Sequence, residues 1–309
     1  MRQVFLFVGI VLALAFGGAI AQQQTGSVVP TLHVTSYCPS GCDSTATTFV
    51  VPYGASGLNA TYCGSGGAGG GGFAGSANAA GGGGASGSCY VGWPIAAASG
   101  VTLTLNYAAG PTGGAVSATG HTGTASYITW TQGTFAFSTP YALGGQGGIV
   151  GATAIGGNGG SPNASVSNSA TQPTGSLISF TVGGTGGTAA SGATPVAVSL
   201  TSAISGAYAG GGAGGGGGAG GGAYTGGSTR VFYQTVAGGL VLGGAAGNTN
   251  TCGGGGSGGS SLFALGGTGG TFGTAGSNGA GNAAGGGGGP CNSAGGNGGD
   301  GIIIISWYQ

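Results

Sequence analysis

Charged side chains are almost absent from this sequence. Among its 309 residues the only ones are Arg2, Asp43, Arg230 and Asp300, so neither Lys nor Glu occurs. Most of the usual carriers of proton transfer and electrophilic catalysis are therefore missing, which argues against an enzyme. A nucleic-acid partner is also excluded, because affinity for nucleic acid comes largely from Lys and Arg that neutralise phosphates.

The remaining polar residues do not form a recognisable active-site motif. Asp43, His121 and one of the many serines could form a triad, but position singles out no nucleophile. Residues 255–259 match the G-x-S-x-G pattern, yet they lie in a glycine tract without the strand-to-helix context of a nucleophile elbow. We predict that the protein is not an enzyme and has no catalytic residue and no cofactor.

The low charge also predicts how copies of the chain behave together. Little electrostatic repulsion separates them, and a net charge near zero favours association. The first expected partner is therefore the protein itself, as a homopolymer. Few groups titrate between acid and neutral pH, so we also expect stability to change little in strong acid.

Amphipathic helical patterns are missing as well, and the longest apolar run stands at the start of the chain. Residues 4–16 are apolar, follow Met1-Arg2-Gln3 and lead to a small-residue cleavage pattern at residues 19–21, which is typical of a signal peptide. The run is shorter than the roughly 20 apolar residues of a spanning helix. We expect a signal peptide at residues 1–21, an extracellular or cell-surface location, and no membrane span after cleavage.

The mature chain, residues 22–309, is expected to form one glycine-rich domain, with a possible subdivision near residues 210–227. Its six cysteines indicate disulfides, because an even number in an exported chain usually pairs. Their positions favour three local pairs, which are Cys38 with Cys42, Cys63 with Cys89, and Cys252 with Cys291. A metal site from His33, Cys38 and Cys42 is the alternative. Its spacing matches no common zinc pattern, so we expect no metal.

Short segments between the glycine tracts alternate apolar and hydroxyl residues, which predicts half-buried strands. The expected strands are residues 32–37, 49–51, 101–107, 127–130, 177–182, 196–200 and 231–236. A continuous run of Ile302, Ile303, Ile304 and Ile305 is typical of a central strand buried on both faces. The same run is a candidate inter-subunit strand, because a terminal strand can complete a neighbouring sheet.

Glycine is what this chain has in excess, with 86 residues and runs such as 210–222 and 285–289. Glycine tracts are flexible linkers by default. However, the charge that disordered segments usually carry is missing, and 40% of the residues are hydrophobic. We expect extended, polyproline-II-like runs that hydrogen-bond laterally. The predicted fold is all-β, a sandwich or roll whose long glycine-rich loops pack as a polyglycine-II-like bundle.

The order of motifs resembles a known group of proteins. In chain order they are F-V-V-P-Y-G at 49–54, a strand with Leu58, Ala60 and Tyr62, poly-glycine at 64–72, Trp93-Pro94-Ile95, Ser99-Gly100, a strand at 101–105, Ala108-Ala109-Gly110, and G-G-N-G-G-D-G at 295–301 before the isoleucines. Over residues 45–308 the chain is similar to the glycine-rich domains of bacteriophage tail-fibre adhesins and related microbial and viral surface proteins. That resemblance implies a polyglycine-II lattice beneath variable loops that bind a surface receptor. The signal peptide and the cysteines depart from a phage tail tip and favour a secreted cell-surface protein.

The sequence leaves three functions open. The first is a secreted structural protein, a self-assembling subunit of an extracellular filament or surface layer. The second is a receptor-binding adhesin in which Tyr90, Trp93 and Trp130 contact a cell-surface glycan or protein. The third is ice binding, because flat uncharged glycine lattices resemble polyglycine-type antifreeze proteins, although their strict three-residue repeat is missing here. Two sequons, at Asn59 and Asn163, are candidate glycosylation sites.

Overall fold

A computed structural model describes residues 29–74, 79–151, 254–271 and 273–309, together with the backbone of four two-residue strands. Those short strands are β8 (Phe180–Thr181), β9 (Ala207–Tyr208), β10 (Thr229–Arg230) and β11 (Leu240–Val241), of which β8 pairs with β9 and β10 with β11. The signal peptide, the candidate subdivision at 210–227, and the expected strands at 196–200 and 231–236 lie outside the described residues. The described part contains strands and no helix, so the fold class is all-β as predicted.

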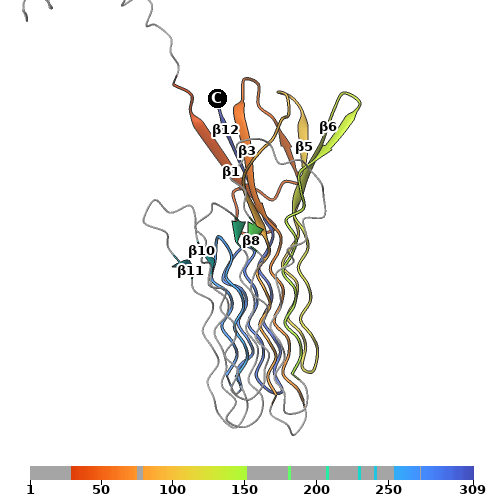
Figure 1. Ribbon diagram of the computed structural model, residues 1–309, viewed down its shortest axis with the longest axis vertical. Helices are drawn as coiled ribbons and strands as arrows, with labels where there is room; N and C mark the ends of the chain where they lie inside the picture. Colours follow the sequence, from red (N-terminus) through yellow and green to blue (C-terminus); the bar gives the residue numbers. More distant parts are fainter. Residues whose placement is uncertain are drawn as a thin grey trace, which may run out of the picture.

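Two four-stranded antiparallel sheets form the upper part of the molecule (Figure 1). Sheet A has the order β1 (Leu32–Tyr37), β12 (Ile302–Tyr308), β3 (Ser56–Cys63) and β4 (Cys89–Pro94). Sheet B has the order β2 (Thr48–Val50), β5 (Thr102–Asn106), β6 (Tyr127–Gln132) and β7 (Phe135–Ser138). β1 has the predicted bounds, and β2, β5 and β6 differ from their predictions by one or two residues.

The inner faces of the two sheets share one apolar core. The alternation of β5 directs Leu103 and Leu105 inward and leaves Thr102 and Thr104 exposed, as a period of two requires. Tyr62 of β3 is fully buried in the same cluster, and its hydroxyl donates to the carbonyl of Pro140 at 3.0 Å. The two sheets therefore form a β-sandwich.

β12 corrects one expectation about the isoleucine run. Its neighbours β1 and β3, both from the same chain, occupy its two edges. Ile303 and Ile305 face the sandwich core, whereas Ile302 packs with Leu262 and the Cys63–Cys89 disulfide on the opposite face. Because the strand has no free edge, the expectation that residues 302–305 pair with a neighbouring subunit is wrong. The run is a central strand of its own domain.

Below the sandwich, glycine-rich runs extend side by side along the longest axis of the molecule (Figure 1). Residues 64–72, which we call the central run, follow a strict three-residue period. Its N–H groups at 64, 67 and 70 donate to residues 82–88, those at 65, 68 and 71 to residues 118–124, and those at 66, 69 and 72 to residues 293–299. These bonds measure 2.8–3.0 Å. Its carbonyls accept from three further runs, at 114–117, 145–148 and 286–289.

Six hydrogen-bonded neighbours around one extended run define a polyglycine-II-like packing, since a left-handed helix with three residues per turn presents its backbone in successive directions. At its glycines the lattice leaves no space for a side chain. A Cβ at Gly66 would lie 1.9 Å from the carbonyl oxygen of Ala284, and one at Gly69 would lie 2.0 Å from that of Gly287. The ordered bundle expected from the sequence is present in the described residues.

Candidate functional site

The three aromatic residues proposed to contact a receptor are in the core. Tyr90 is 1% exposed, Trp93 7% and Trp130 8%, and all three belong to the cluster between the sheets. The register shift of β4 at Gly92 lets Tyr90 and Trp93, three residues apart, both face the opposite sheet, and the alternation of β6 turns Trp130 inward. The expectation that they form a binding surface is therefore wrong.

Two of the three expected disulfides are present among the described residues. Cys38 and Cys42 close a short loop, with Cα atoms 5.6 Å apart, and Cys63 and Cys89 join β3 to β4, with Cα atoms 4.1 Å apart. Cys291 is also disulfide-bonded, while Cys252 lies outside the described residues.

The alternative metal site is not formed. Two of its three ligands, Cys38 and Cys42, are bonded to each other, and the ring of His33 stacks on Trp307 with centroids 5.2 Å apart. No group of three metal-ligating side chains occurs elsewhere in the described part of the chain.

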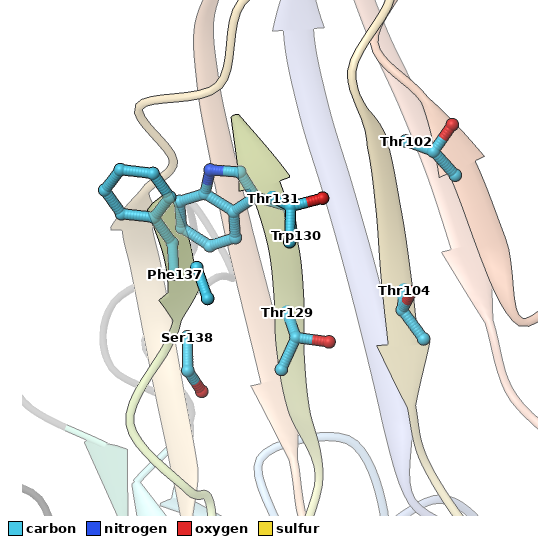
Figure 2. A pocket seen from close by; sticks show the side chains of 8 residues that line it. Thr102, Thr104, Thr129, Trp130, Thr131, Phe137 and Ser138 are labelled. Carbon is cyan, nitrogen blue, oxygen red and sulfur yellow. The ribbon is translucent and has the colours of Figure 1, made fainter. Parts of the chain in front are cut away.

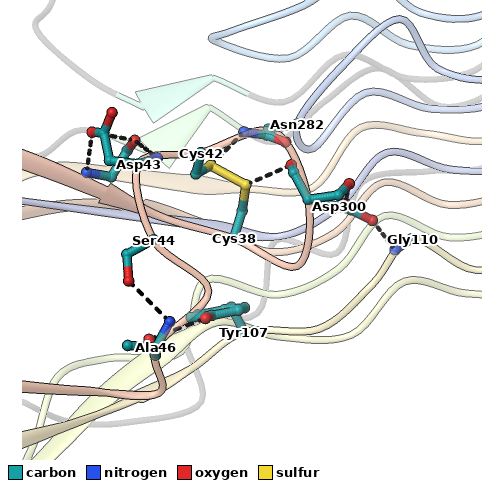
Figure 3. Close-up of a disulfide and its surroundings, with 11 residues drawn as sticks. Cys38, Cys42, Asp43, Ser44, Ala46, Tyr107, Gly110, Asn282 and Asp300 are labelled. Atoms are coloured by element: carbon teal, nitrogen blue, oxygen red, sulfur yellow. Dashed lines mark hydrogen bonds between the residues drawn. A yellow bond between two sulfur atoms is a disulfide. The ribbon is translucent and has the colours of Figure 1, made fainter.

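The Cys38–Cys42 loop covers one end of the outer edge of sheet A (Figure 3). β1 is the edge strand, and Ser36 turns its backbone groups away from β12. A carboxylate oxygen of Asp43 accepts from the N–H of Ser36 at 2.9 Å and from its hydroxyl at 2.8 Å, and the N–H of Ser44 donates to the carbonyl of Ser36. These bonds hold the pKa of Asp43 below its usual value. The loop therefore occupies the position in which another strand would pair with Ser36.

Among the described residues, no such loop covers the outer edge of sheet B. Thr139 N–H bonds to the carbonyl of Ile128, so the alternation of an antiparallel ladder turns the backbone of Ala136 and Ser138 outward. No hydrogen bond from the described part of the chain reaches those outward N–H groups. Phe135 is 70% exposed and Phe137 41% exposed on the same strand. β7 is thus an uncharged, apolar edge that is open to pairing.

The outer face of sheet B carries a row of hydroxyl side chains (Figure 2). Thr48, Thr104, Thr129 and Ser138 are successive cross-strand partners across all four strands. Neighbouring strands lie about 4.8 Å apart, so the hydroxyl groups repeat at about that spacing. Thr102 and Thr131 lie on the same face and border a shallow depression of about 380 Å³.

The outer face of sheet A is apolar and hollowed. A groove of about 540 Å³ lies between exposed Leu32 and Val34 on β1, Tyr308 on β12 and Phe263 from a loop of the bundle. Asn59, the residue of the first sequon, lines this groove and is half-buried. Asn163 lies outside the described residues. Sheet A therefore presents an apolar groove where sheet B presents hydroxyls.

Comparison with known proteins agrees with this architecture. A family model described as a glycine-rich domain matches residues 42–308. The chain belongs to the glycine-rich domain family. No curated protein matches it.

Two strands of this glycine-rich domain were not predicted from its sequence. β4 and β7 were not among the expected strands, although Gly133, with φ of 64°, marks the tight turn that joins β6 to β7. The apolar and small residues of Phe135–Ser138 after that turn were the available signal for a hairpin. As for membrane contact, no helix in the described ranges is long and apolar enough to cross a bilayer.

Proposed function

We propose that this protein is a secreted structural protein, and that its copies assemble through open sheet edges into an extracellular filament or surface layer. The observation that carries the proposal is the unprotected edge of β7. Soluble β-proteins usually protect an edge strand with charged side chains, proline or a covering loop. Phe135–Ser138 contain no charged residue and no proline, and no loop of the described residues hydrogen-bonds to the outer edge of β7.

A second copy fits this edge because antiparallel pairing of β7 with itself satisfies both strands equally. The outward N–H and C=O groups of Ala136 and Ser138 would meet the same groups of the partner around a twofold axis. Pairing would also cover part of Phe135 and Phe137, the exposed aromatic residues of the strand. Little charge on either copy opposes the contact.

One edge alone gives a dimer, so a longer assembly needs another contact. β1 offers a weaker one, because no hydrogen bond from the described ranges reaches the outward backbone groups of Leu32 and Val34, while the loop at Asp43 covers Ser36. A subunit that pairs through both β7 and β1 can continue a chain of copies. The glycine bundle supports this role as a stiff body, since its runs are cross-linked laterally along their length.

A single charge at the β7 edge tests the proposal. In Ala136→Lys the ammonium stands at the pairing edge, so polymers seen by electron microscopy and light scattering should give way to single copies. Thr131→Lys is the matched control, because Thr131 is the cross-strand partner of Ala136 on the same face but lies on the interior strand β6. It should still polymerise. A wild-type protein that stays monomeric, or two variants that polymerise equally, would contradict the proposal.

The hydroxyl row on sheet B favours ice binding as a second candidate function. Its three threonines and one serine are uncharged and regularly spaced over four strands, with Thr48, Thr104 and Ser138 exposed and Thr129 half-buried. A freezing assay should then show thermal hysteresis that Thr129→Lys abolishes and Val34→Lys, on the outer face of sheet A, retains. Equal hysteresis in both variants, or none in the wild type, removes this candidate.

A further inference from the structure

We propose that Asn59 carries an N-linked glycan whose first sugars lie in the apolar groove on the outer face of sheet A. The inference goes beyond self-assembly; it shares with the proposed function the requirement for export, and its groove borders the β1 edge at Leu32 and Val34. Its starting point is the sequon Asn59-Ala60-Thr61, which here lies on a strand rather than on a loop.

The fold directs the acceptor side chain away from the core. Along β3, Leu58, Ala60 and Tyr62 face the opposite sheet, so Asn59 and Thr61 are on the outer face. The Nδ2 of Asn59 donates to the carbonyl of Gly57 at 2.7 Å. A glycosylated amide keeps one N–H, so this hydrogen bond can remain after sugar attachment. The native position of Asn59 is therefore compatible with the modified side chain.

Two irregularities in sheet A open space around the sequon. The β12–β3 register shifts between Ser306 and Tyr308, and the β3–β4 register shifts opposite Thr61, where Gly92 has a φ of 64°. The N–H of Gly92 donates to the Thr61 hydroxyl at 3.1 Å. A Cβ at Gly92 would meet nothing within 4 Å, so the space above β4 at this point is open. Bulges of this kind commonly re-aim a side chain at a functional position.

The groove walls suit a neutral sugar. Tyr308 and Phe263 offer exposed aromatic rings, against which the C–H faces of a pyranose pack, and Ser306 adds a hydroxyl. None of the residues that line the groove is charged. Left bare, the apolar surface that includes Leu32 and Val34 is an aggregation liability on a protein with so little charge. A glycan in the groove would cover it.

The modification needs a lipid-linked oligosaccharyl diphosphate as donor and a transferase of the secretory pathway. The bond from the anomeric carbon of the donor to its diphosphate oxygen breaks, and that carbon forms a new bond with Nδ2 of Asn59. Nδ2 loses one proton to a base of the transferase, and the lipid diphosphate leaves with the bonding electrons. No oxidant or reductant takes part.

Secretion from a eukaryotic host tests the site. The chain is produced with a host signal peptide in place of residues 1–21, so site occupancy is measured whether or not its own leader directs export. Arg230 is the sole Lys or Arg after residue 21, so peptides are made with chymotrypsin and analysed by mass spectrometry. We expect a glycan mass on the Asn59 peptide, its complete loss in Asn59→Gln, and its retention in Thr61→Ser and Asn163→Gln. Secreted protein in which wild-type Asn59 is unmodified would overturn the proposal.

The position of the sugars has its own test. Enzymatic release of the Asn59 glycan should be slower from the native protein than from the denatured protein, and faster from native Tyr308→Ala than from native wild type. Asn59→Gln should bind more of a fluorescent dye for apolar surface than Asn163→Gln binds. Equal release rates together with equal dye binding would show that the glycan does not occupy the groove. Polymerisation is measured separately, so failure of self-assembly leaves both results interpretable.

Discussion

The glycine bundle and the β-sandwich are stabilised by opposite parts of the same chain. The central run has glycine at seven of its nine positions and is held by backbone hydrogen bonds to six neighbouring runs. The sandwich is held by large side chains, such as Tyr62, Leu103 and Ile303, that fill the space between two sheets. Adding a methyl group should therefore damage the bundle, whereas removing side-chain atoms should damage the sandwich.

The largest effect is expected from Gly66→Ala. The new Cβ would lie 1.9 Å from the carbonyl oxygen of Ala284, and the obstructing atoms are backbone atoms of Ala284 and Gly285 that cannot move aside as a flexible side chain could. Overpacking usually costs about 1–3 kcal/mol, and here it would also displace hydrogen bonds of the central run, so we expect a loss of more than about 3 kcal/mol. Guanidinium unfolding followed by circular dichroism measures it.

Gly100→Ala is the control for that substitution. Gly100 is an exposed glycine of the turn before β5, its φ is 80°, and a Cβ there would meet nothing within 4 Å. The loss of stability should be about 1–2 kcal/mol, which is what a left-handed backbone conformation costs a residue with a Cβ. Equal losses in the two variants would mean that the lattice is looser than the distances indicate.

Ile303→Ala should have the next largest effect and act on the sandwich. Ile303 is fully buried in the central strand of sheet A, so truncation leaves a cavity between the sheets. We expect a loss of about 2–5 kcal/mol, whereas Ile303→Val should lose only about 0.5–1.5 kcal/mol. If Ala and Val cost the same, the core is not packed around this side chain as described.

The contrast between the two regions also explains what the sequence could predict. Strands such as residues 101–107 could be predicted because apolar and hydroxyl side chains alternate along them, which indicates which face is buried. The bundle is encoded instead by the spacing of glycines in each run. Around the central run, outer runs keep two glycines in three, as in G-G-Q-G-G-I at 144–149 and G-G-N-G-G-D at 295–300, or one in three, as at Gly120 and Gly123.

The number of glycines per turn thus follows the number of neighbours that a run contacts. Gln146, Ile149 and Asn297 occupy the third position of such triplets and are exposed. The sequence has no strict glycine repeat because the outer runs place larger residues at exposed positions, and even the central run accommodates the small buried residues Ser65 and Ala68. The buried positions of Tyr90, Trp93 and Trp130 were missed for another reason, since an aromatic residue near a loop gives no sign of the face it occupies.

Removing the disulfide that lies between the two regions should reduce stability somewhat less than Gly66→Ala or Ile303→Ala. Cys63–Cys89 links β3 to β4, with a sequence separation of 26, where the strands lead into the bundle. The double variant Cys63→Ser/Cys89→Ser should lose about 3.5 kcal/mol of stability in the chain-entropy model. The Cys38–Cys42 pair, with a separation of 4, closes a shorter loop and should cost about 2 kcal/mol. The reverse order, measured by thermal unfolding, would contradict this entropic account.

The buried tyrosines should have the smallest effect on stability at neutral pH. At alkaline pH, however, their ionisation should destabilise the sandwich before the bundle. Burial raises the pKa of Tyr90 to about 12 and also raises that of Tyr62, from an ordinary value of 10.0. Their protonated forms therefore stabilise the sandwich fully below pH 10, and this contribution is lost as the pH rises toward 12. The central run and its six neighbours contain no tyrosine. Near-ultraviolet circular dichroism should lose its aromatic signal in that range before the extended-backbone signal of the bundle changes, and simultaneous loss would mean that the two regions unfold as one unit.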